Sequence, residues 1–386
     1  MNRPEEILTA INAELEKASR PKTLHVVESI EQRAIWEVQV KSPGKLNDTQ
    51  EGWRAWWRSG TATVLSLRPD DDILNLQFVT GSPPKTGEIV QLYPPLFLEE
   101  LRELWKRPSL AGKALEWFDS VMGGDQPSGC PPLIPSFRGL RKAQKEAFRL
   151  PSFACGYLWG PPGTGKTFTV GALLADYLRQ FPNARVLLLS NANSAVDQAI
   201  VSVDKSVDEL IARDPKAGEL RGLYLRMGVH FRAGEYLGRE YLLPITDPAT
   251  LSEIAELERN RPPSVNASDY AKWKERVQRV RKSIPRQMGR GRLTAITTTE
   301  AVLRFDELRE LAPFDLMVFD EASQVGRAQA LALATLAKSV IFAGDQKQLG
   351  PIVQGADNAY VQRWLGASMF EGVKTTWPTT CFLGAC

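Results

Sequence analysis

The segment 160–167, with the sequence GPPGTGKT, constrains the fold of this 386-residue chain more than any other feature. It matches the phosphate-binding pattern G-x-x-x-x-G-K-[ST], follows the apolar run CGYLW and precedes a helical stretch. Its glycines allow successive backbone N–H groups to point at phosphate oxygens, and the N-terminus of the following helix adds partial positive charge. The sequence therefore predicts a strand–loop–helix unit that binds the phosphates of a nucleotide.

The residues of this loop have predicted roles. Lys166 is expected to reach the β- and γ-phosphates of ATP, and the Thr167 hydroxyl is expected to bind Mg²⁺. A chance Gly/Pro turn is the alternative, and the strand before the loop and the helix after it argue against that alternative. The predicted ATP-binding residues are Gly160, Pro161, Pro162, Gly163, Thr164, Gly165, Lys166 and Thr167.

A pair of acidic residues, Asp320 and Glu321, follows the apolar run LMVF, where a buried strand is expected to end. Asp320 is predicted to hold Mg²⁺ through its water shell, and Glu321 is predicted to orient and deprotonate the attacking water. A strand that ends in Asp-Glu could instead cap the next helix. Because the same chain carries the phosphate loop, we favour the catalytic interpretation and predict an ATP hydrolase.

Apolar runs alternate with helical stretches around both motifs, as in CGYLW, VLLLS, TAITT, DLMVF and SVIFA. Strands that alternate with helices indicate a parallel sheet with crossover helices. We therefore predict an α/β fold, with a P-loop, RecA-like sheet flanked by helices in residues 137–201 and 292–372. A polar helical insertion is predicted at 202–291, and an atypical tail at 373–386.

The N-terminal part of the chain has a different pattern. Residues 1–22 have the apolar spacing of an amphipathic helix. Residues 23–95 contain short alternating runs separated by turn-rich pieces, which predicts a small β-barrel or sandwich. Residues 96–136 combine helical periodicity with a Gly/Pro-rich connector, so we predict stalk helices and a linker there.

Bulk properties exclude several classes of protein. The four cysteines and two histidines are too few and too scattered for a disulfide framework or a structural zinc site. No apolar stretch approaches the roughly 20 residues of a membrane span, and the N-terminus lacks a secretion signal. We expect a cytoplasmic protein with no membrane partner. The net charge of +3 neither excludes nor demands a nucleic-acid partner.

Two further segments carry a family resemblance. Residues 320–324 (DEASQ) and 344–351 (GDQKQLGP) resemble motifs II and III of superfamily 1 helicases. The closest likeness is the superfamily 1B branch of senataxin and the DNA or RNA helicases of the nonsense-mediated-decay type. That resemblance implies that Gln348 contacts the γ-phosphate and couples it to the nucleic-acid site. An AAA-type assembly ATPase also carries GPPGTGKT, but GDQKQL after the next strand argues against that class.

Weaker segments extend the resemblance to about residues 24–370. Residues 141–144 (RKAQ) look like the Q motif, which implies that Gln144 lies against the adenine. Residues 193–197 (NSAVD) resemble motif Ia, which implies that Asn193 and Ser194 contact the sugar-phosphate backbone of a single strand. Ala192 stands where the family has a hydroxyl, which puts one phosphate contact in doubt. Arg226 looks like the start of the family's R-x-G segment.

The run of threonines at 297–299 resembles another backbone-contacting loop of the family, which implies that Thr297 and Thr298 also contact the strand. The same resemblance implies a barrel on a helical stalk and an accessory insertion after motif Ia.

Two segments outside these motifs have the composition of nucleic-acid surfaces. Residues 272–292 contain nine basic side chains against the single acid Glu275, which suits phosphate binding or a solvated helix face equally. Residues 53–58 (WRAWWR) combine aromatic and basic side chains, as base-stacking platforms do. Tryptophans near a β domain more often fill its core, and we favour that interpretation.

Helicases of this type hydrolyse ATP between two RecA-like domains, and the second domain supplies arginines worth about 10³–10⁵ in rate. The family's later motifs do not occur after Pro351 in this sequence. We therefore expect a core truncated after motif III that binds ATP and Mg²⁺, acts on single-stranded nucleic acid and needs a second RecA-like domain in trans. The alternative is a non-motor, ATP-dependent module that binds nucleic acid or protein.

Overall fold

The computed structural model describes residues 2–18, 22–32, 35–41, 53–68, 72–93, 97–122, 126–228, 231–245, 248–262, 269, 272–273, 276–277, 280 and 291–384. The chain divides into two compact units. The first consists of Met1–Glu14, Phe97–Leu251 and Ile284–Cys386, and the second of Leu15–Leu96 and Ser252–Ser283. Within the described residues, none of the helices has the length and apolar character needed to cross a membrane.

The described part of the first unit is built on a seven-stranded sheet in the order β13-β7-β12-β11-β8-β10-β9, and its neighbouring strands pair in parallel. Every residue of β7 and β8 is buried, which is expected when helices cover both faces of a parallel sheet. The predicted α/β parallel sheet is confirmed. Its strands are β7 (Cys155–Trp159), β8 (Val186–Ser190), β9 (Tyr224–Arg226), β10 (Leu293–Thr297), β11 (Phe314–Asp320), β12 (Ala337–Gly344) and β13 (Thr380–Phe382).

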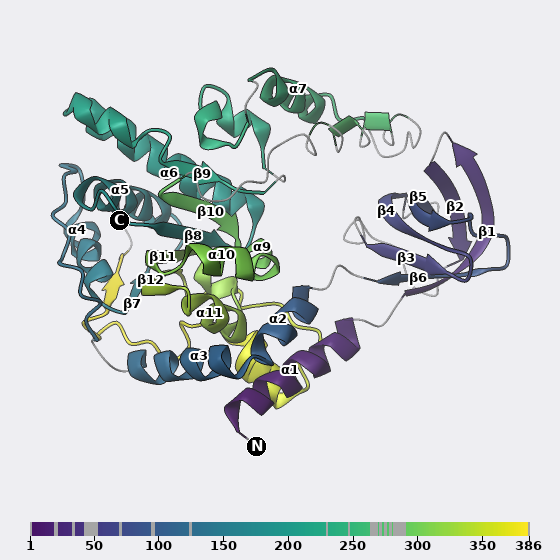
Figure 1. Cartoon of the computed structure of the whole chain (residues 1–386), viewed down its shortest axis with the longest axis horizontal. Helices are drawn as coiled ribbons and strands as arrows, with labels where there is room; N and C mark the ends of the chain where they lie inside the picture. Colours follow the sequence, from purple (N-terminus) through teal and green to yellow (C-terminus); the bar gives the residue numbers. More distant parts are fainter. Residues whose placement is uncertain are drawn as a thin grey trace. The chain divides into compact units, whose positions relative to one another are not determined.

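Helices cover this sheet in two groups, which Figure 1 shows on opposite sides of the strands. Helices α5 and α6 pack against each other in one group, and α11 packs against α2 and α3 in the other. The indole N–H of Trp105 in α2 donates to the carbonyl of Ala328 in α11 at 3.1 Å, and Lys113 in α3 donates to the carbonyl of Thr335 at 2.7 Å. These contacts fix the predicted stalk helices to the sheet's covering layer.

The helices of the structure are α1 (Arg3–Ala18), α2 (Phe97–Trp105), α3 (Pro108–Val121), α4 (Lys142–Glu146), α5 (Lys166–Gln180), α6 (Asn193–Ile211), α7 (Pro248–Arg259), α9 (Thr298–Leu303), α10 (Phe305–Leu311), α11 (Arg327–Ala334) and α12 (Ala359–Val361).

The two edge strands lie in segments that the sequence assigned elsewhere. Strand β9 falls in 202–291, predicted as a helical insertion, yet it pairs with β10. Strand β13 falls in the predicted atypical tail, yet it pairs with β7. Each has three residues, too few for a period-2 pattern to identify a strand, so their pairing depends on the neighbouring strand.

The second unit contains a closed barrel in the order β1-β2-β5-β4-β3-β6. Its interior holds aliphatic side chains and Trp57, which is 1% exposed, with Trp36 and Trp53 packed partly against them. Trp56, on the opposite face of the same strand, is 51% exposed. The interpretation that the tryptophans of WRAWWR fill the core is therefore right for Trp57 and wrong for Trp56. The strands are β1 (Lys22–Gln32), β2 (Ile35–Lys41), β3 (Arg54–Trp57), β4 (Gly60–Arg68), β5 (Ile73–Gly81) and β6 (Ile89–Tyr93).

Candidate nucleotide-binding site

Three neighbouring strands, β7, β12 and β11, end at the same edge of the sheet. The phosphate loop follows β7, the segment 344–351 follows β12, and Asp320 ends β11. The backbone N–H of Gly160 donates to the carbonyl of Gly344 at 3.2 Å, which ties the loop to the end of β12. Parallel strands place their carboxyl ends together, so this order of strands alone brings the three motifs into one site.

The phosphate loop has the backbone that the motif predicts. Gly163 and Gly165 have φ of 77° and 83°, in the left-handed region, and Gly165 is the N-cap of α5. The Lys166 ammonium donates to the carbonyls of Gly160 at 2.7 Å and Pro161 at 3.2 Å, so it lies inside the curve of the loop. A curled loop with a central ammonium group at a helix N-terminus fits a nucleotide phosphate.

The two left-handed glycines differ in the space around them, which gives a testable contrast. A Cβ at Gly163 would meet nothing within 4 Å, whereas a Cβ at Gly165 would lie 3.1 Å from the Gln144 amide nitrogen. We expect Gly163→Ala to lower the free energy of unfolding by about 1 kcal/mol through backbone strain alone. We expect Gly165→Ala to lower it further, because Gln144 must also move. Urea denaturation of both variants measures the difference.

Gly112→Ala is the control for this contrast. Gly112 lies inside α3, with open space at its Cβ and no positive φ, so alanine there should raise stability by about 0.5–1 kcal/mol. Equal losses at Gly163 and Gly165 would contradict the predicted contact with Gln144.

The acidic pair lies next to the phosphate loop. The Thr167 hydroxyl donates to Oδ2 of Asp320 at 3.3 Å, so the two predicted Mg²⁺-binding residues are brought together. Glu321 has a φ of 53°, which is a strained conformation for a residue other than glycine. Its Oε2 atom is buried and has no hydrogen-bond partner among the described residues. A buried carboxylate oxygen without a partner fits a site completed by water, metal or substrate.

Burial and the neighbouring charge of Glu321 raise the pKa of Asp320 to about 6. The Glu321 backbone N–H, the Thr167 hydroxyl and the Lys166 charge act in the opposite direction and lower that pKa. The carboxyl of Asp320 is therefore protonated below about pH 6 in the metal-free protein. Only its ionised form is a ligand for Mg²⁺.

This raised pKa predicts the pH dependence of metal binding. Below about pH 6, a proton competes with Mg²⁺ for Asp320, so Mg²⁺-dependent nucleotide affinity should fall about tenfold for each further pH unit. The measurement is a Mg²⁺ titration of fluorescent ATP analogue binding between about pH 5 and pH 8. In the Asp320→Asn control the pH dependence should disappear. A wild-type affinity that stays constant down to pH 5 would contradict this assignment.

The side chain of Gln144 is 5% exposed and lies against the start of the phosphate-loop helix. Its Oε1 accepts from the Arg141 backbone N–H at 2.9 Å, and its Nε2 donates to the Thr169 hydroxyl at 3.2 Å. The structure thus shows Gln144 supporting the loop from α4. Its predicted contact with adenine stays a prediction.

Gln348 lies in the turn after β12 and is half-buried. The turn is held by Asp345, whose Oδ1 accepts from the Trp159 indole at 3.2 Å and from the Lys347 backbone at 3.0 Å. These hydrogen bonds join motif III to β7, the strand before the phosphate loop. It supports the predicted proximity of Gln348 to the phosphates.

Asn193, which is predicted to contact a nucleic-acid strand, is exposed at the start of α6, and Ser194 is half-buried beside it. The Asn193 carbonyl Oδ1 accepts from the buried guanidinium of Arg226 at 2.7 Å. Arg226 also donates through Nε to Asp197 at 2.9 Å, and Asp197 accepts from the Tyr236 hydroxyl at 2.6 Å. Motif Ia and the R-x-G segment are therefore joined by a buried ion pair. The sequence did not predict that Arg226 pairs with Asp197. The available signal was the presence of opposite charges in the two motif segments.

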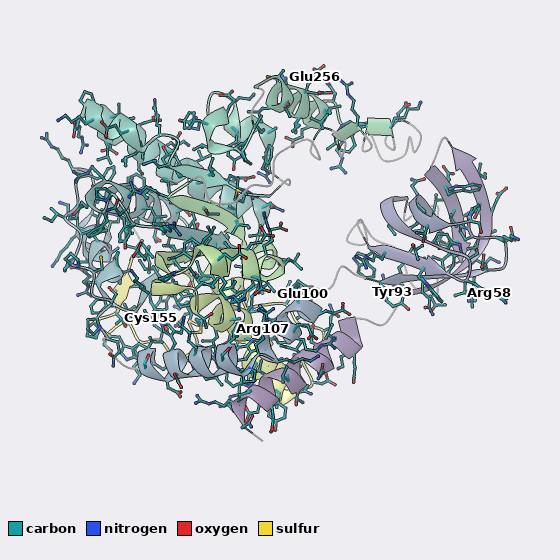
Figure 2. All side chains as sticks on the ribbon, viewed as in Figure 1. Arg58, Tyr93, Glu100, Arg107, Cys155 and Glu256 are labelled. Atoms are coloured by element: carbon teal, nitrogen blue, oxygen red, sulfur yellow. The ribbon has the colours of Figure 1, made fainter. Side chains whose placement is uncertain are left out.

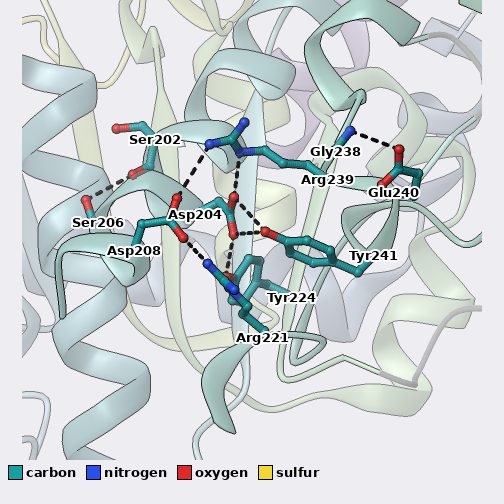
Figure 3. A network of polar contacts seen from close by, with 10 residues as sticks. All are labelled: Ser202, Asp204, Ser206, Asp208, Arg221, Tyr224, Gly238, Arg239, Glu240 and Tyr241. Carbon is teal, nitrogen blue, oxygen red and sulfur yellow. Dashed lines mark hydrogen bonds and ion pairs between the residues drawn. The ribbon is translucent and has the colours of Figure 1, made fainter. Parts of the chain in front are cut away.

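A second buried carboxylate ties the same helix to the segment that follows β9 (Figure 3). Asp204 accepts from the Tyr224 hydroxyl at 2.8 Å, from Arg239 at 2.6 Å and from the Tyr241 hydroxyl at 2.9 Å. Burial and Asp204 raise the pKa of Tyr241 to about 12, so the hydroxyl remains a donor at neutral pH. The network is a structural support for α6.

Thr297 and Thr298 join β10 to α9 at the same sheet edge. The Thr297 hydroxyl caps α9 by accepting from the Glu300 backbone at 3.2 Å. Thr298 is fully buried, and its hydroxyl has no hydrogen-bond partner among the described residues. Its side chain does not reach the surface. A contact between Thr298 and a nucleic-acid strand would therefore have to be made by the Thr298 backbone.

Most of the basic segment lies outside the described residues, including Lys274, Arg279, Arg281, Lys282, Arg286 and Arg290. Of the described members, Arg276 pairs with Glu253 at 2.8 Å and Lys272 pairs with Asp269 at 3.6 Å. Arg292 donates to the carbonyls of Leu178 and Ala184, so it supports the fold at the start of β8.

Comparison with known proteins gives several matches. A family model described as an AAA domain matches residues 249–355, which include the acidic pair and motif III. The Regulator of nonsense transcripts 1 homolog of Arabidopsis thaliana is 26% identical over 56% of this chain and 16% of its own length. The DNA-binding protein SMUBP-2 of Rattus norvegicus is 27% identical over 62% of this chain and 25% of its own length.

The ATP-dependent helicase NAM7 of Saccharomyces cerevisiae is 26% identical over 62% of this chain and 23% of its own length. The chain thus spans a quarter or less of each of these three relatives. The solved arterivirus nonstructural protein 10 helicase aligns with 98% of the chain and 54% of its own, at 13% identity and a TM-score of 0.34. That likeness is too weak to support an argument.

The sequence matches agree with the motifs and with their placement along one edge of a parallel sheet. In its sequence the chain is similar to helicases of superfamily 1, and the matched AAA domain covers the acidic pair and motif III.

Proposed function

We propose that this chain binds and hydrolyses ATP with Mg²⁺ as the motor core of a helicase or translocase that acts on single-stranded nucleic acid. The observation that carries the proposal is the meeting of Lys166, Thr167, Asp320 and Glu321 at one sheet edge. In this role Lys166 binds the β- and γ-phosphates, and Gln348 is the candidate sensor of the γ-phosphate. Thr167 and Asp320 would hold Mg²⁺, which neutralises charge on the phosphates when bound.

Hydrolysis requires a water molecule oriented toward the γ-phosphate and a group that accepts its proton. Glu321 has the chemistry for both tasks, and its Oε2 atom, which has no partner among the described residues, can accept a hydrogen bond from that water. We further propose that arginines of a second RecA-like domain, from the same or another polypeptide, complete the site, as in other phosphoryl-transfer motors.

The strand-binding part of the proposal rests on the motif Ia region and the loop at Thr297. Asn193 is exposed, and its carbonyl oxygen is held by Arg226, so its amide N–H groups are directed away from the arginine. Such a donor suits a phosphate or sugar oxygen, which positions a strand without reading its sequence.

ATP turnover with and without a single-stranded oligonucleotide tests this proposal. We expect Lys166→Ala to abolish measurable binding of a fluorescent ATP analogue, because it removes the only ammonium group seen within the described phosphate loop. Lys145→Ala, an exposed substitution on α4, is the control and should bind ATP normally. Normal ATP binding by the Lys166→Ala variant would contradict the assignment of residues 160–167 as the nucleotide-binding site. If the oligonucleotide neither binds nor changes the rate of ATP turnover, the non-motor alternative is favoured.

A further inference from the structure

One face of the barrel combines exposed aromatic and basic side chains. Strand β3 alternates between exposed and buried residues, so Arg54 and Trp56 point outward while Ala55 and Trp57 point into the core. Arg58 follows in the turn after β3 and is also exposed. Figure 2 labels Arg58 and Tyr93, which lie on the side of the barrel that β3 and β6 form.

The strands beside β3 extend this surface with polar side chains. Trp56 lies directly opposite Thr61 of β4 and Gln91 of β6, and Arg54 lies opposite Tyr93 of β6. Directly opposite residues share a face, with Cβ atoms about 5 Å apart. We call these residues the Trp56 face: Arg54, Trp56, Arg58, Thr61, Gln91 and Tyr93.

Hydrogen bonding leaves donors directed outward on the Trp56 face. The Tyr93 hydroxyl donates to Oε1 of Gln91 at 2.8 Å, which fixes that amide's orientation and leaves its N–H groups as donors beside Trp56. Within the described residues, the guanidinium groups of Arg54 and Arg58 take part in no hydrogen bond or ion pair, although the backbone of Arg54 pairs with β4 and β6. Strands β3, β4 and β6 contain no aspartate or glutamate, so no acid on these strands neutralises the two guanidinium groups.

An indole that is half exposed between two arginines, neither of them ion-paired within the described part of the chain, is unusual for a tryptophan. A tryptophan loses more hydrophobic stabilisation by exposure than other residues, and this barrel already buries Trp57 in its core. The face is too positively charged to suit an apolar partner. Its ring and its charges match the two parts of a nucleic-acid strand, whose bases stack and whose phosphates are anionic.

We propose that the Trp56 face binds single-stranded nucleic acid, with one base stacked on Trp56 and flanking phosphates bound by Arg54 and Arg58. Arg54 and Trp56 are two residues apart on β3, so their backbones are separated by about 6.6 Å along the strand. The Arg54 guanidinium is therefore within side-chain reach of a phosphate that flanks a base stacked on Trp56. Because bases of every type have a flat face, this surface binds strands with little sequence preference. The inference rests on the proposed function, to which it adds a second strand-binding surface.

The test measures binding of the full chain to a fluorescein-labelled oligothymidylate of roughly 16 nucleotides by anisotropy, over a range of salt concentrations. We expect Trp56→Ala to weaken affinity by about 5- to 150-fold without changing its salt dependence. We expect Trp56→Phe to retain most of the affinity. Arg54→Ala and Arg58→Ala should each reduce the slope of log affinity against log salt by about 0.7.

Two matched controls lie on other parts of the barrel. Lys41→Ala removes an exposed basic residue on β2, which is the strand most distant from β3 in the barrel order. Ile30→Ala removes an exposed apolar residue on β1. Both should leave affinity and salt slope unchanged, and binding of an ATP analogue should be unaffected in every variant.

Wild-type binding that is matched by Trp56→Ala, at all salt concentrations, would overturn this inference and leave the proposed function standing. If wild type binds ATP but no oligonucleotide, both the inference and the strand-binding part of the proposed function fail. If Trp56→Ala changes sedimentation but not strand affinity, the face joins copies of the chain and the inference is wrong. If Trp56→Ala does not fold, the salt slopes of the two arginine variants and the affinity of Trp56→Phe decide the outcome.

Discussion

Replacing Glu321 with glutamine is expected to lower the rate of ATP hydrolysis by about 10²–10⁴-fold while nucleotide binding stays within a factor of about two. Glutamine keeps the size of the side chain but cannot accept the proton of the attacking water. The proposed phosphate contacts come from Lys166 and the loop backbone, which this substitution leaves intact. The measurement is strand-stimulated ATP turnover, together with the affinity for a fluorescent ATP analogue.

The matched control for this prediction is Glu310→Gln, which removes the same charge from an exposed position in α10. Its turnover should equal that of wild type. A Glu321→Gln variant with wild-type turnover would show that another group accepts the proton. A large loss of nucleotide affinity would instead assign Glu321 a role in binding.

The buried ion pair of Arg226 and Asp197 is expected to dominate the stability of the motif Ia region. Both side chains are almost completely buried, at 1% and 0% exposure, with Nε and Oδ1 2.9 Å apart. Arg226→Met leaves the Asp197 charge buried, and its remaining donors among the described residues are the Tyr236 hydroxyl and the Arg232 backbone. We expect it to lower the free energy of unfolding by about 3–5 kcal/mol, measured by urea denaturation.

A double variant distinguishes the cost of a buried unpaired charge from the cost of lost side-chain packing. In Arg226→Met with Asp197→Leu, no charge remains buried, so much of the lost stability should return. The exposed pair of Arg3 and Asp119 is the control, because breaking it by Arg3→Met should cost about 1 kcal/mol or less. A loss at Arg226 no larger than the loss at Arg3 would contradict this account. So would a double variant that is less stable than Arg226→Met.

Local sequence was sufficient for the elements that carry the nucleotide site. The pattern of 160–167 contains its own structural requirements, since glycines supply the left-handed turns at Gly163 and Gly165 and the lysine begins the helix. Asp320 could be placed at a strand end because the preceding residues form an unbroken apolar run. The parallel sheet followed from the alternation of strands and helices, and it is confirmed.

Other features depended on contacts between residues far apart in the chain. Strands β9 and β13 have three residues each, and only pairing with β10 and β7 defines them. Trp56 and Trp57 are adjacent and chemically identical in the sequence, yet one is exposed and the other is in the core. The register of β3 against β4 and β6 decided which of them points outward.

The sequence by itself determined the backbone of the phosphate loop and predicted the chemistry of that loop and of the acidic pair, because short motifs impose their own backbone geometry. Only the tertiary structure decided that β12 lies between β7 and β11, which brings the loop, motif III and Asp320 to one edge. It also decided that Arg226 is buried as the partner of Asp197. Strand order and burial arise from long-range packing, whose partners are not encoded in any one segment.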